Sequence, residues 1–279
     1  MGNIFKMIDT IHMFDEYSQS PDELTKEQRH QKRMALEPLI FGALTRKYGA
    51  FLKKTWDSHT VPTDTNKRIV IVERRIHPNL AFVLYNAAYY GSNWAITIVC
   101  SDMNYEYCKS IVGGKESVSL LPFFEGIGTP EEGKKEYNLL LQSEKFYSLF
   151  SEDHLCILET DCYFRRKIPD WVLQFDLLAS PYNWDETMAG GGLSFRNRNS
   201  MIKICSTFPE KLEAQDVYLW NGARALQMKL PLFEDAVSQL TESVFSLNPF
   251  GVHQWWTFFF PNDIPDAGTY FKELMTLQA

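Results

Sequence analysis

The chain lacks the features that define several large classes of protein. Its apolar runs fall well short of the roughly 18 residues that a membrane-spanning helix needs. One of the longest, Trp255–Phe260, stops at Pro261. Basic charge is not in excess, because 28 Lys and Arg stand against 35 Asp and Glu, for a net charge of −7. A general nucleic-acid binder usually presents a basic field to the phosphates, so this balance disfavours bulk nucleic acid as a partner.

Cysteine is scarce, and its spacing is uninformative. The five residues are an odd number, and no two have C-x-x-C spacing (Cys100, Cys108, Cys156, Cys162 and Cys205). We therefore expect neither a disulfide framework nor a cysteine-based zinc site, but buried thiols in a reducing compartment. The first residues lack the apolar core of a signal peptide, and Lys6 stands where a myristoylation site needs Ser or Thr. These observations predict a cytoplasmic protein.

What is present is a globular composition with 45% apolar and 14% aromatic residues, which excludes a disordered chain, a collagen-like repeat and a coiled coil. From Arg68 onward, predicted strands alternate with helical patterns. The strands are expected at 69–72, 95–100, 118–123 and 155–158, and the helices from Leu80, at 105–112 and at 139–150. This alternation predicts an α/β fold with a mainly parallel sheet, whose ligands bind beyond the carboxyl ends of the strands.

A phosphate-binding loop is missing at the place where two common α/β classes carry one. The segment after the first strand, Glu73-Arg74-Arg75-Ile76, is neither G-x-G-x-x-G nor a Walker motif. The sequence therefore disfavours a standard dinucleotide-binding fold and a P-loop NTPase.

Residues 1–66 differ from the rest, and we expect a helical N-terminal extension ahead of a domain over residues 67–279. Thr25-Lys26-Glu27-Gln28 has the pattern of a helix capping box. The segment Lys26–Lys54 holds eight basic and two acidic residues, a net of +6 that leaves −13 for the remainder. A basic helix could touch a membrane surface or a partner. The commoner explanation is a solvated face on a helical appendage.

Two carboxylates follow the predicted strand 155–158. Glu159 and Asp161 are two residues apart, so in an extended chain their side chains point to the same side. Paired carboxylates suit a hard divalent cation such as Mg²⁺ or Mn²⁺. Acidic residues also end many strands without binding any ion.

Three further segments could carry chemistry. Gly190–Gly192 either leave backbone open to a ligand or form a plain turn. Asp216 enters an apolar, helical run, either as a catalytic base or as an ordinary carboxylate at a helix N-terminus. His253, beside two tryptophans, is either a metal ligand or a packed, hydrogen-bonded histidine.

Taken in order, these features resemble the GT-A-type nucleotide-sugar glycosyltransferases. The nearest resemblance is to a little-characterised glycosyltransferase-like family of bacteria and large DNA viruses, known as a domain of unknown function. It spans about Arg68 to Trp256 and is carried by Ile71-Val72-Glu73-Arg74-Arg75-x-His77-Pro78, Glu159-Thr160-Asp161, Gly191-Gly192-Leu193-Ser194-Phe195-Arg196, Gln215-Asp216-Val217 and Pro249-x-Gly251-x-His253. It implies one GT-A-like domain with a Rossmann-like central sheet, in the host cytoplasm if the protein is viral.

The resemblance also implies a role for each matching position. Glu73 and Arg75 would lie near the nucleotide base and ribose. Glu159 and Asp161 would take the place of the family's Asp-x-Asp, with Asp161 on the metal and Glu159 on the ribose or a metal-bound water.

His253 would complete the metal shell. Gly191 and Gly192 would line the space where the donor sugar meets the acceptor. Asp216 would be the base of an inverting enzyme.

The implied activity is metal-dependent transfer of a sugar from a nucleotide diphosphate sugar to a glycan or other hydroxyl acceptor, with Mn²⁺ or Mg²⁺. The sequence departs from the family pattern at Glu159, Gly190 and Gln215, where Asp, Asn and Glu are common. Two alternatives stay open. One is a nucleotidyltransferase, which usually carries a basic, Gly-rich loop that this chain lacks. The other is a degenerate, non-catalytic module that binds a sugar or a partner.

Overall fold

The computed structural model describes residues 10–17, 19, 24–126 and 128–278. A six-stranded sheet lies at its centre, in the order β3-β2-β1-β4-β7-β6. Its strands are β1 (Lys67–Val72), β2 (Ala95–Ser101), β3 (Val118–Phe124), β4 (His154–Leu158), β6 (Leu177–Pro181) and β7 (Ala189–Asn197). The four strands from β3 to β4 pair in parallel, and β7 pairs antiparallel with both of its neighbours. The expected α/β fold with a mainly parallel sheet is confirmed.

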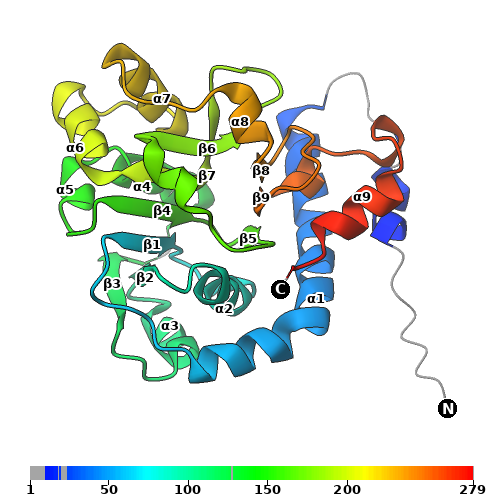
Figure 1. Cartoon of the computed structure of the whole chain (residues 1–279), viewed down its shortest axis with the longest axis horizontal. Helices are drawn as coiled ribbons and strands as arrows, with labels where there is room; N and C mark the ends of the chain where they lie inside the picture. The colour runs from blue at the N-terminus through cyan, green and yellow to red at the C-terminus, as the bar shows by residue number, and fades with distance from the viewer. Residues whose placement is uncertain (1–9, 18, 20–23, 127, 279) are drawn as a thin grey trace.

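Helices cover both faces of this sheet (Figure 1). They are α1 (Lys26–Ser58), α2 (Leu80–Tyr90), α3 (Tyr105–Val112), α4 (Pro130–Leu140), α5 (Glu144–Tyr147), α6 (Arg198–Thr207), α7 (Gln215–Ala225), α8 (Phe233–Val237) and α9 (Ala267–Leu274). Four short 3-10 helices complete the described chain: η1 (Thr10–Tyr17), η2 (Asp170–Gln174), η3 (Trp255–Thr257) and η4 (Pro261–Asp263).

The β-branched run in β1 supplies both halves of the core. Ile69 and Ile71 point to the face covered by α1, α2 and α3, whereas Val70 and Val72 point to the face covered by α5, α6 and α7. All four side chains are buried. Successive side chains of a strand alternate between faces, so a strand enclosed on both sides must be apolar throughout.

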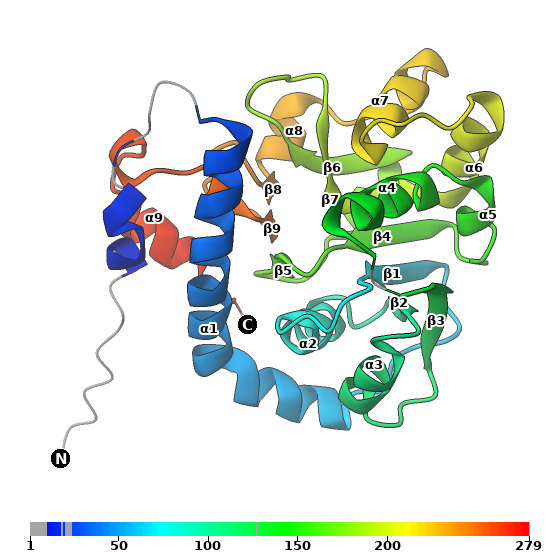
Figure 2. The same ribbon diagram turned by 180° about the vertical axis from the view of Figure 1, so that it is seen from behind.

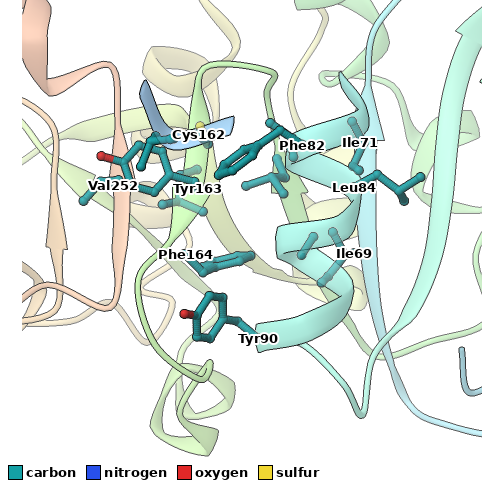
Figure 3. Close-up of a cluster of buried hydrophobic side chains, with 14 of the residues drawn as sticks. Ile69, Ile71, Phe82, Leu84, Tyr90, Cys162, Tyr163, Phe164 and Val252 are labelled. Carbon is teal, nitrogen blue, oxygen red and sulfur yellow. The ribbon is translucent and has the colours of Figure 1, made fainter. Parts of the chain in front are cut away.

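A second, small sheet stands beyond the carboxyl end of β4. It consists of β5 (Cys162–Phe164), β9 (Gly251–His253) and β8 (Leu240–Thr241), in that order. Asn86, fully buried on α2, clamps β5 by donating to the carbonyl of Phe164 and accepting from its N–H. Phe82, Tyr163 and Phe164 pack around this junction (Figure 3). The clamp fixes the strand that follows the two candidate carboxylates.

The N-terminal helix α1 begins at the capping box expected from the sequence, with Thr25 as N-cap and Gln28 as the reciprocal partner. One stripe of α1 is buried in the main core (Leu36, Ile40, Phe41, Leu44, Leu52 and Trp56). The helix runs past the small sheet and α9 and continues along α2 (Figure 2). The solvated face expected for its basic residues is found at Arg46 and Lys47, whereas Lys32 is fully buried. The buried stripe of α1 shares a core with the sheet.

Most of the helices and strands expected from the sequence are present, and one expected helix is not. The four expected strands and the helices at α2 and α3 are confirmed. The single helix expected over 139–150 is wrong, because α4 ends at Leu140 and only the four-residue α5 follows. Trp255, Trp256 and Phe259 are core residues, and all five cysteines are free thiols. Among the described residues, no helix combines the length and apolarity that a membrane crossing requires.

A candidate metal centre beside a carboxylate turn

Glu159 and Asp161 lie in a turn between β4 and β5. The turn closes through a hydrogen bond from the N–H of Cys162 to the carbonyl of Glu159, at 3.2 Å. The N–H of Glu159 donates to the carbonyl of Gly192 on β7, at 2.8 Å. These backbone bonds fix the turn on both sides, so the two carboxylates stand at the carboxyl edge of the central sheet, where the sequence predicted them.

His253 reaches the same place from the end of β9, because β9 pairs antiparallel with β5 and sets His253 opposite Cys162. Its Nε2 lies 3.4 Å from Oδ1 of Asp161 and 3.8 Å from Oε2 of Glu159. The side chain of His253 is buried, yet within the described chain neither ring nitrogen completes a hydrogen bond. A buried polar group of this kind requires an explanation, and a bound cation is one of the ordinary explanations.

The glycine run is part of strand β7, so the alternative of a plain turn is wrong. Its missing side chains leave space for neighbouring groups. A Cβ on Gly192 would stand 2.6 Å from Nε2 of His253 and 2.9 Å from Oε2 of Glu159. A Cβ on Gly191 would overlap the amide of Gln215. The backbone of Gly192 therefore forms one wall of the carboxylate–histidine cluster, whereas Gly191 is covered by Gln215.

Glu242 stands behind the histidine. Its Oε2 lies 3.0 Å from Nδ1 of His253, and its Oε1 accepts a hydrogen bond from the side-chain amide of Gln254. Its side chain is 2% exposed. This carboxylate–histidine arrangement resembles the outer partner that orients most histidine ligands of metals. A Cβ on Gly190 would collide with Glu242, so the missing side chain of Gly190 leaves the space that Glu242 occupies.

Arg33 of α1 completes the cluster from the opposite side. Its Nη2 donates to Oδ2 of Asp161 at 2.6 Å. Burial alone would raise the pKa of Asp161, but the charges of Arg33 and His253 outweigh it and hold that pKa well below its usual range. Burial and then the charge of Asp161 raise the pKa of Glu159. The pKa values of the two carboxylates are thus shifted in opposite directions, because positive charge outweighs burial at Asp161 but not at Glu159.

The donor set fits a divalent cation. Oδ1 of Asp161, Nε2 of His253 and Sγ of Cys162 lie within 4.8 Å of one another. Octahedral ligands at about 2.1 Å from Mg²⁺ or Mn²⁺ are about 3 Å from their neighbours. Oδ1 of Asp161 and Nε2 of His253 are 3.4 Å apart, close to this spacing, and Oε2 of Glu159 is 3.8 Å from the same nitrogen. Burial raises the pKa of the Cys162 thiol well above its usual range, and the thiol contacts the carbonyl of Gly192. The thiol already donates to that carbonyl, and the carboxylate oxygens that remain in the cluster suit Mn²⁺ or Mg²⁺.

Glu73 and Arg75 lie at the neighbouring strand end, after β1. Glu73 is buried and holds the guanidinium of Arg75 through two hydrogen bonds of 2.8 Å. Its Oε2 also accepts from the hydroxyl of Thr160, in the carboxylate turn. Glu73 therefore links two strand ends, while the side chain of Arg75 keeps 56% of its surface exposed.

Asp216 begins α7, on the other flank of the glycine strand. Its Oδ2 accepts from the hydroxyl of Tyr182 and its Oδ1 from the N–H of Val217. The ring of Tyr182 stacks on Trp184 with centroids 4.3 Å apart and planes 21° apart. Trp184 is 59% exposed. The candidate base thus adjoins an exposed aromatic surface formed by Tyr182 and Trp184.

The sequence did not single out Arg33, Glu242 or Tyr182. Arg33 belonged to a helix that sequence patterns assigned to an appendage, and Glu242 lies in an irregular segment without a motif. Only the register of β9 against β5 and β8 brings Glu242 behind His253. The basic charge of residues 26–54 was the one signal that pointed toward Arg33.

Comparison with known proteins agrees in part with the resemblance. A family model described as "Protein of unknown function (DUF5672)" matches residues 129–253, the segment that contains Glu159, Asp161, Asp216 and His253. None of the curated proteins compared with the chain matches it in sequence.

Several solved structures are similar. One is a cytidylyltransferase from Leptospira borgpetersenii, 13% identical with a TM-score of 0.39 over 62% of this chain and 74% of that chain. Another is the glycosyltransferase GlyE of Streptococcus pneumoniae, 12% identical, with a TM-score of 0.42 over 62% of this chain and 46% of that chain. The apo form of GlyE gives a TM-score of 0.45 at 12% identity, over 77% of this chain and 61% of that chain.

Proposed function

We propose that the protein is a metal-dependent glycosyltransferase that moves a sugar from a nucleotide diphosphate sugar to an acceptor hydroxyl. One observation carries the proposal: Glu159, Asp161 and the buried His253 converge at the carboxyl end of a parallel sheet. Ligands of open α/β sheets bind at this edge. The cluster is accessible on one side, because the Glu159 side chain keeps 27% of its surface exposed.

Asp161, Glu159 and His253 would hold Mn²⁺ or Mg²⁺. Such an ion supplies Lewis-acid stabilisation of the negative charge that develops on a leaving nucleoside diphosphate. Gly192 would keep the wall beside the cluster open, since any side chain there would fill the position between His253 and Glu159. Arg75, held in place by Glu73 and half exposed, would contact the nucleotide.

The acceptor would approach from the Asp216 side. Asp216 would accept the proton of the attacking hydroxyl, in the manner of an inverting transferase, and Tyr182 would orient the carboxylate through the hydrogen bond between them. The exposed face of Trp184 offers an apolar surface on which a sugar ring could stack. These positions imply a glycan or another molecule with a sugar-like ring as acceptor.

Titration calorimetry with Mn²⁺ and a panel of sugar nucleotides tests the proposal on the wild-type protein and Asp161→Ala. We expect the wild type to bind a sugar nucleotide only when Mn²⁺ is present. Asp161→Ala should bind neither Mn²⁺ nor the sugar nucleotide. Equal nucleotide binding by both proteins, or binding by neither, would contradict the metal-bridged site.

A second assay identifies the chemistry. The wild type is incubated with Mn²⁺ and each donor, and slow donor hydrolysis is followed by the products. Release of free sugar and nucleoside diphosphate is the expected side reaction of a transferase. Release of pyrophosphate from a nucleoside triphosphate and a sugar phosphate would instead assign nucleotidyl transfer, and no turnover with any donor would indicate a binding module.

A further inference from the structure

Arg33, from the N-terminal helix, is the feature of the site that neither the sequence motifs nor the family match includes, since the match begins at residue 129. We propose that Arg33 belongs to the donor site and binds the diphosphate of the nucleotide sugar, exchanging its contact with Asp161 for phosphate oxygens. The inference rests on the proposed function and extends it to the basic helix α1.

The position of Arg33 is fixed by the residues around it on α1. Its neighbour Lys32 is fully buried and donates to the carbonyl of Phe259 at 2.7 Å. One turn further along, Glu37 accepts from the side-chain amide of Asn79, which also donates to the carbonyl of Thr160 in the carboxylate turn. The backbone of α1 is therefore anchored on both sides of Arg33, and only the side chain of Arg33 needs to move.

Most hydrogen-bonding capacity of Arg33 is unused. A guanidinium carries five N–H donors. Within the described chain, Arg33 makes a single hydrogen bond, from Nη2 to Asp161, and its Nε lies 3.6 Å from the nearest oxygen of Glu37. Its side chain also keeps 36% of its surface exposed. The guanidinium is therefore partly open to solvent, and its free N–H groups can reach a second anion beside Asp161.

The charges around Asp161 also favour binding of the diphosphate by Arg33. Glu159, Asp161 and Glu242 place three carboxylates around His253, and a diphosphate that approached them without cations would be repelled. Arg33 contacts this cluster directly, and a planar guanidinium matches phosphate oxygens bidentately. Arg75, held by Glu73, lies close enough to Arg33 for their charges to interact, so two guanidinium groups stand near this edge of the sheet.

The test compares Arg33→Gln and Arg33→Lys with the wild type, and Arg46→Gln as the control for the same charge change at an exposed position of α1. Calorimetry measures the affinity for Mn²⁺ alone and, at saturating Mn²⁺, for UDP, GDP, CDP and ADP. For the best-bound nucleotide we expect Arg33→Gln to lose roughly tenfold to a hundredfold in affinity, the value of a charge-assisted hydrogen bond. Arg33→Lys should lose less, and Arg46→Gln nothing.

The affinity for Mn²⁺ alone separates ligand binding from a structural role. Without Arg33, Asp161 loses the guanidinium that competes with the metal, so Arg33→Gln should bind Mn²⁺ as tightly as the wild type or more tightly. A variant that binds both Mn²⁺ and nucleotide more weakly, with a lower melting temperature in Mn²⁺, would overturn the inference in favour of a structural ion pair.

Two outcomes distinguish the inference from the proposed function. If wild type and Arg33→Gln bind metal and nucleotide equally, the inference is wrong and the proposed function stands. If the wild type binds no nucleotide diphosphate in the presence of Mn²⁺, the proposed function fails, and the inference fails with it.

Discussion

Oε2 of Glu242 lies 3.0 Å from Nδ1 of His253, on the side of the ring opposite Asp161 and Glu159. The ring is thus enclosed by carboxylates at both nitrogens. Burial would lower the pKa of His253, but the charges of Glu242 and Asp161 raise it well above its usual range. Glu242 therefore determines the orientation and basicity of the imidazole whose other nitrogen faces the candidate metal position.

The first prediction concerns Glu242→Gln. Loss of this charge should weaken Mn²⁺ binding by roughly tenfold to a hundredfold, because an outer carboxylate orients a histidine ligand and increases its basicity. Calorimetry with Mn²⁺ measures the change, and Glu234→Gln on the exposed surface of α8 is the control. Unchanged Mn²⁺ affinity in Glu242→Gln would contradict a role for Glu242 in orienting a metal-binding His253.

The second prediction concerns Asp216→Asn. The amide preserves the shape of the side chain but cannot accept the proton of the acceptor hydroxyl. We expect unchanged binding of the sugar nucleotide and a roughly 10²- to 10⁴-fold lower transfer rate. Calorimetry and a transfer assay measure the two quantities, with Asp235→Asn at an exposed position as control. Wild-type transfer by Asp216→Asn would remove this residue from the mechanism.

The third prediction concerns Trp184→Ala. Because the exposed ring stacks on Tyr182 beside Asp216, its loss should raise the KM for a glycan acceptor about tenfold and leave the KM for the donor unchanged. A stacking contact with an aromatic ring is worth about 1 kcal/mol or slightly more. Trp184→Phe should restore most of the affinity. An equal rise in both KM values would indicate a general disturbance of the site.

The fourth prediction concerns pH and stability. Burial first, and then the charge of Asp161, raise the pKa of Glu37 to about 7. The folded protein therefore binds a proton that the unfolded chain releases near pH 4.5, and the contribution of Glu37 to the free energy of unfolding declines as pH rises from about 4.5 to about 7. Glu37→Gln removes this pH dependence. Between pH 5 and pH 8, the free energy of unfolding of Glu37→Gln should therefore rise, relative to that of the wild type, by on the order of 3 kcal/mol.

Urea unfolding at pH 5 and pH 8 measures the difference. Glu27→Gln, at the exposed start of α1, controls for the change in net charge of the helix. A constant difference between Glu37→Gln and the wild type at the two pH values would contradict the prediction.

The strand pattern of this protein can be predicted from its sequence because a strand buried on both faces must be apolar at every position. Ile69-Val70-Ile71-Val72 identify β1 in this way, and the strand ends locate Glu159 and Asp161 at the edge where ligands bind. The expectation for residues 139–150 failed because α4 ends at Leu140, within this segment, and only residues 144–147 form a further helix, α5. Local periodicity does not reveal such a break. Residues 1–9 of the predicted extension lie outside the described residues, and so do the positions on which the prediction about a signal peptide rests.

The sequence by itself determined the α/β fold, the carboxylates at the end of β4 and the glycine run. Tertiary structure alone decided three things. Pairing of β9 with β5 brought His253 to the carboxylates, across about 90 residues of chain. Close approach of Glu242, Gln215 and His253 filled the space in which side chains at the three glycines would lie. Docking of α1 placed Arg33 on Asp161, across a sequence separation of 128 residues. Each depends on long-range packing, which a local residue pattern does not encode.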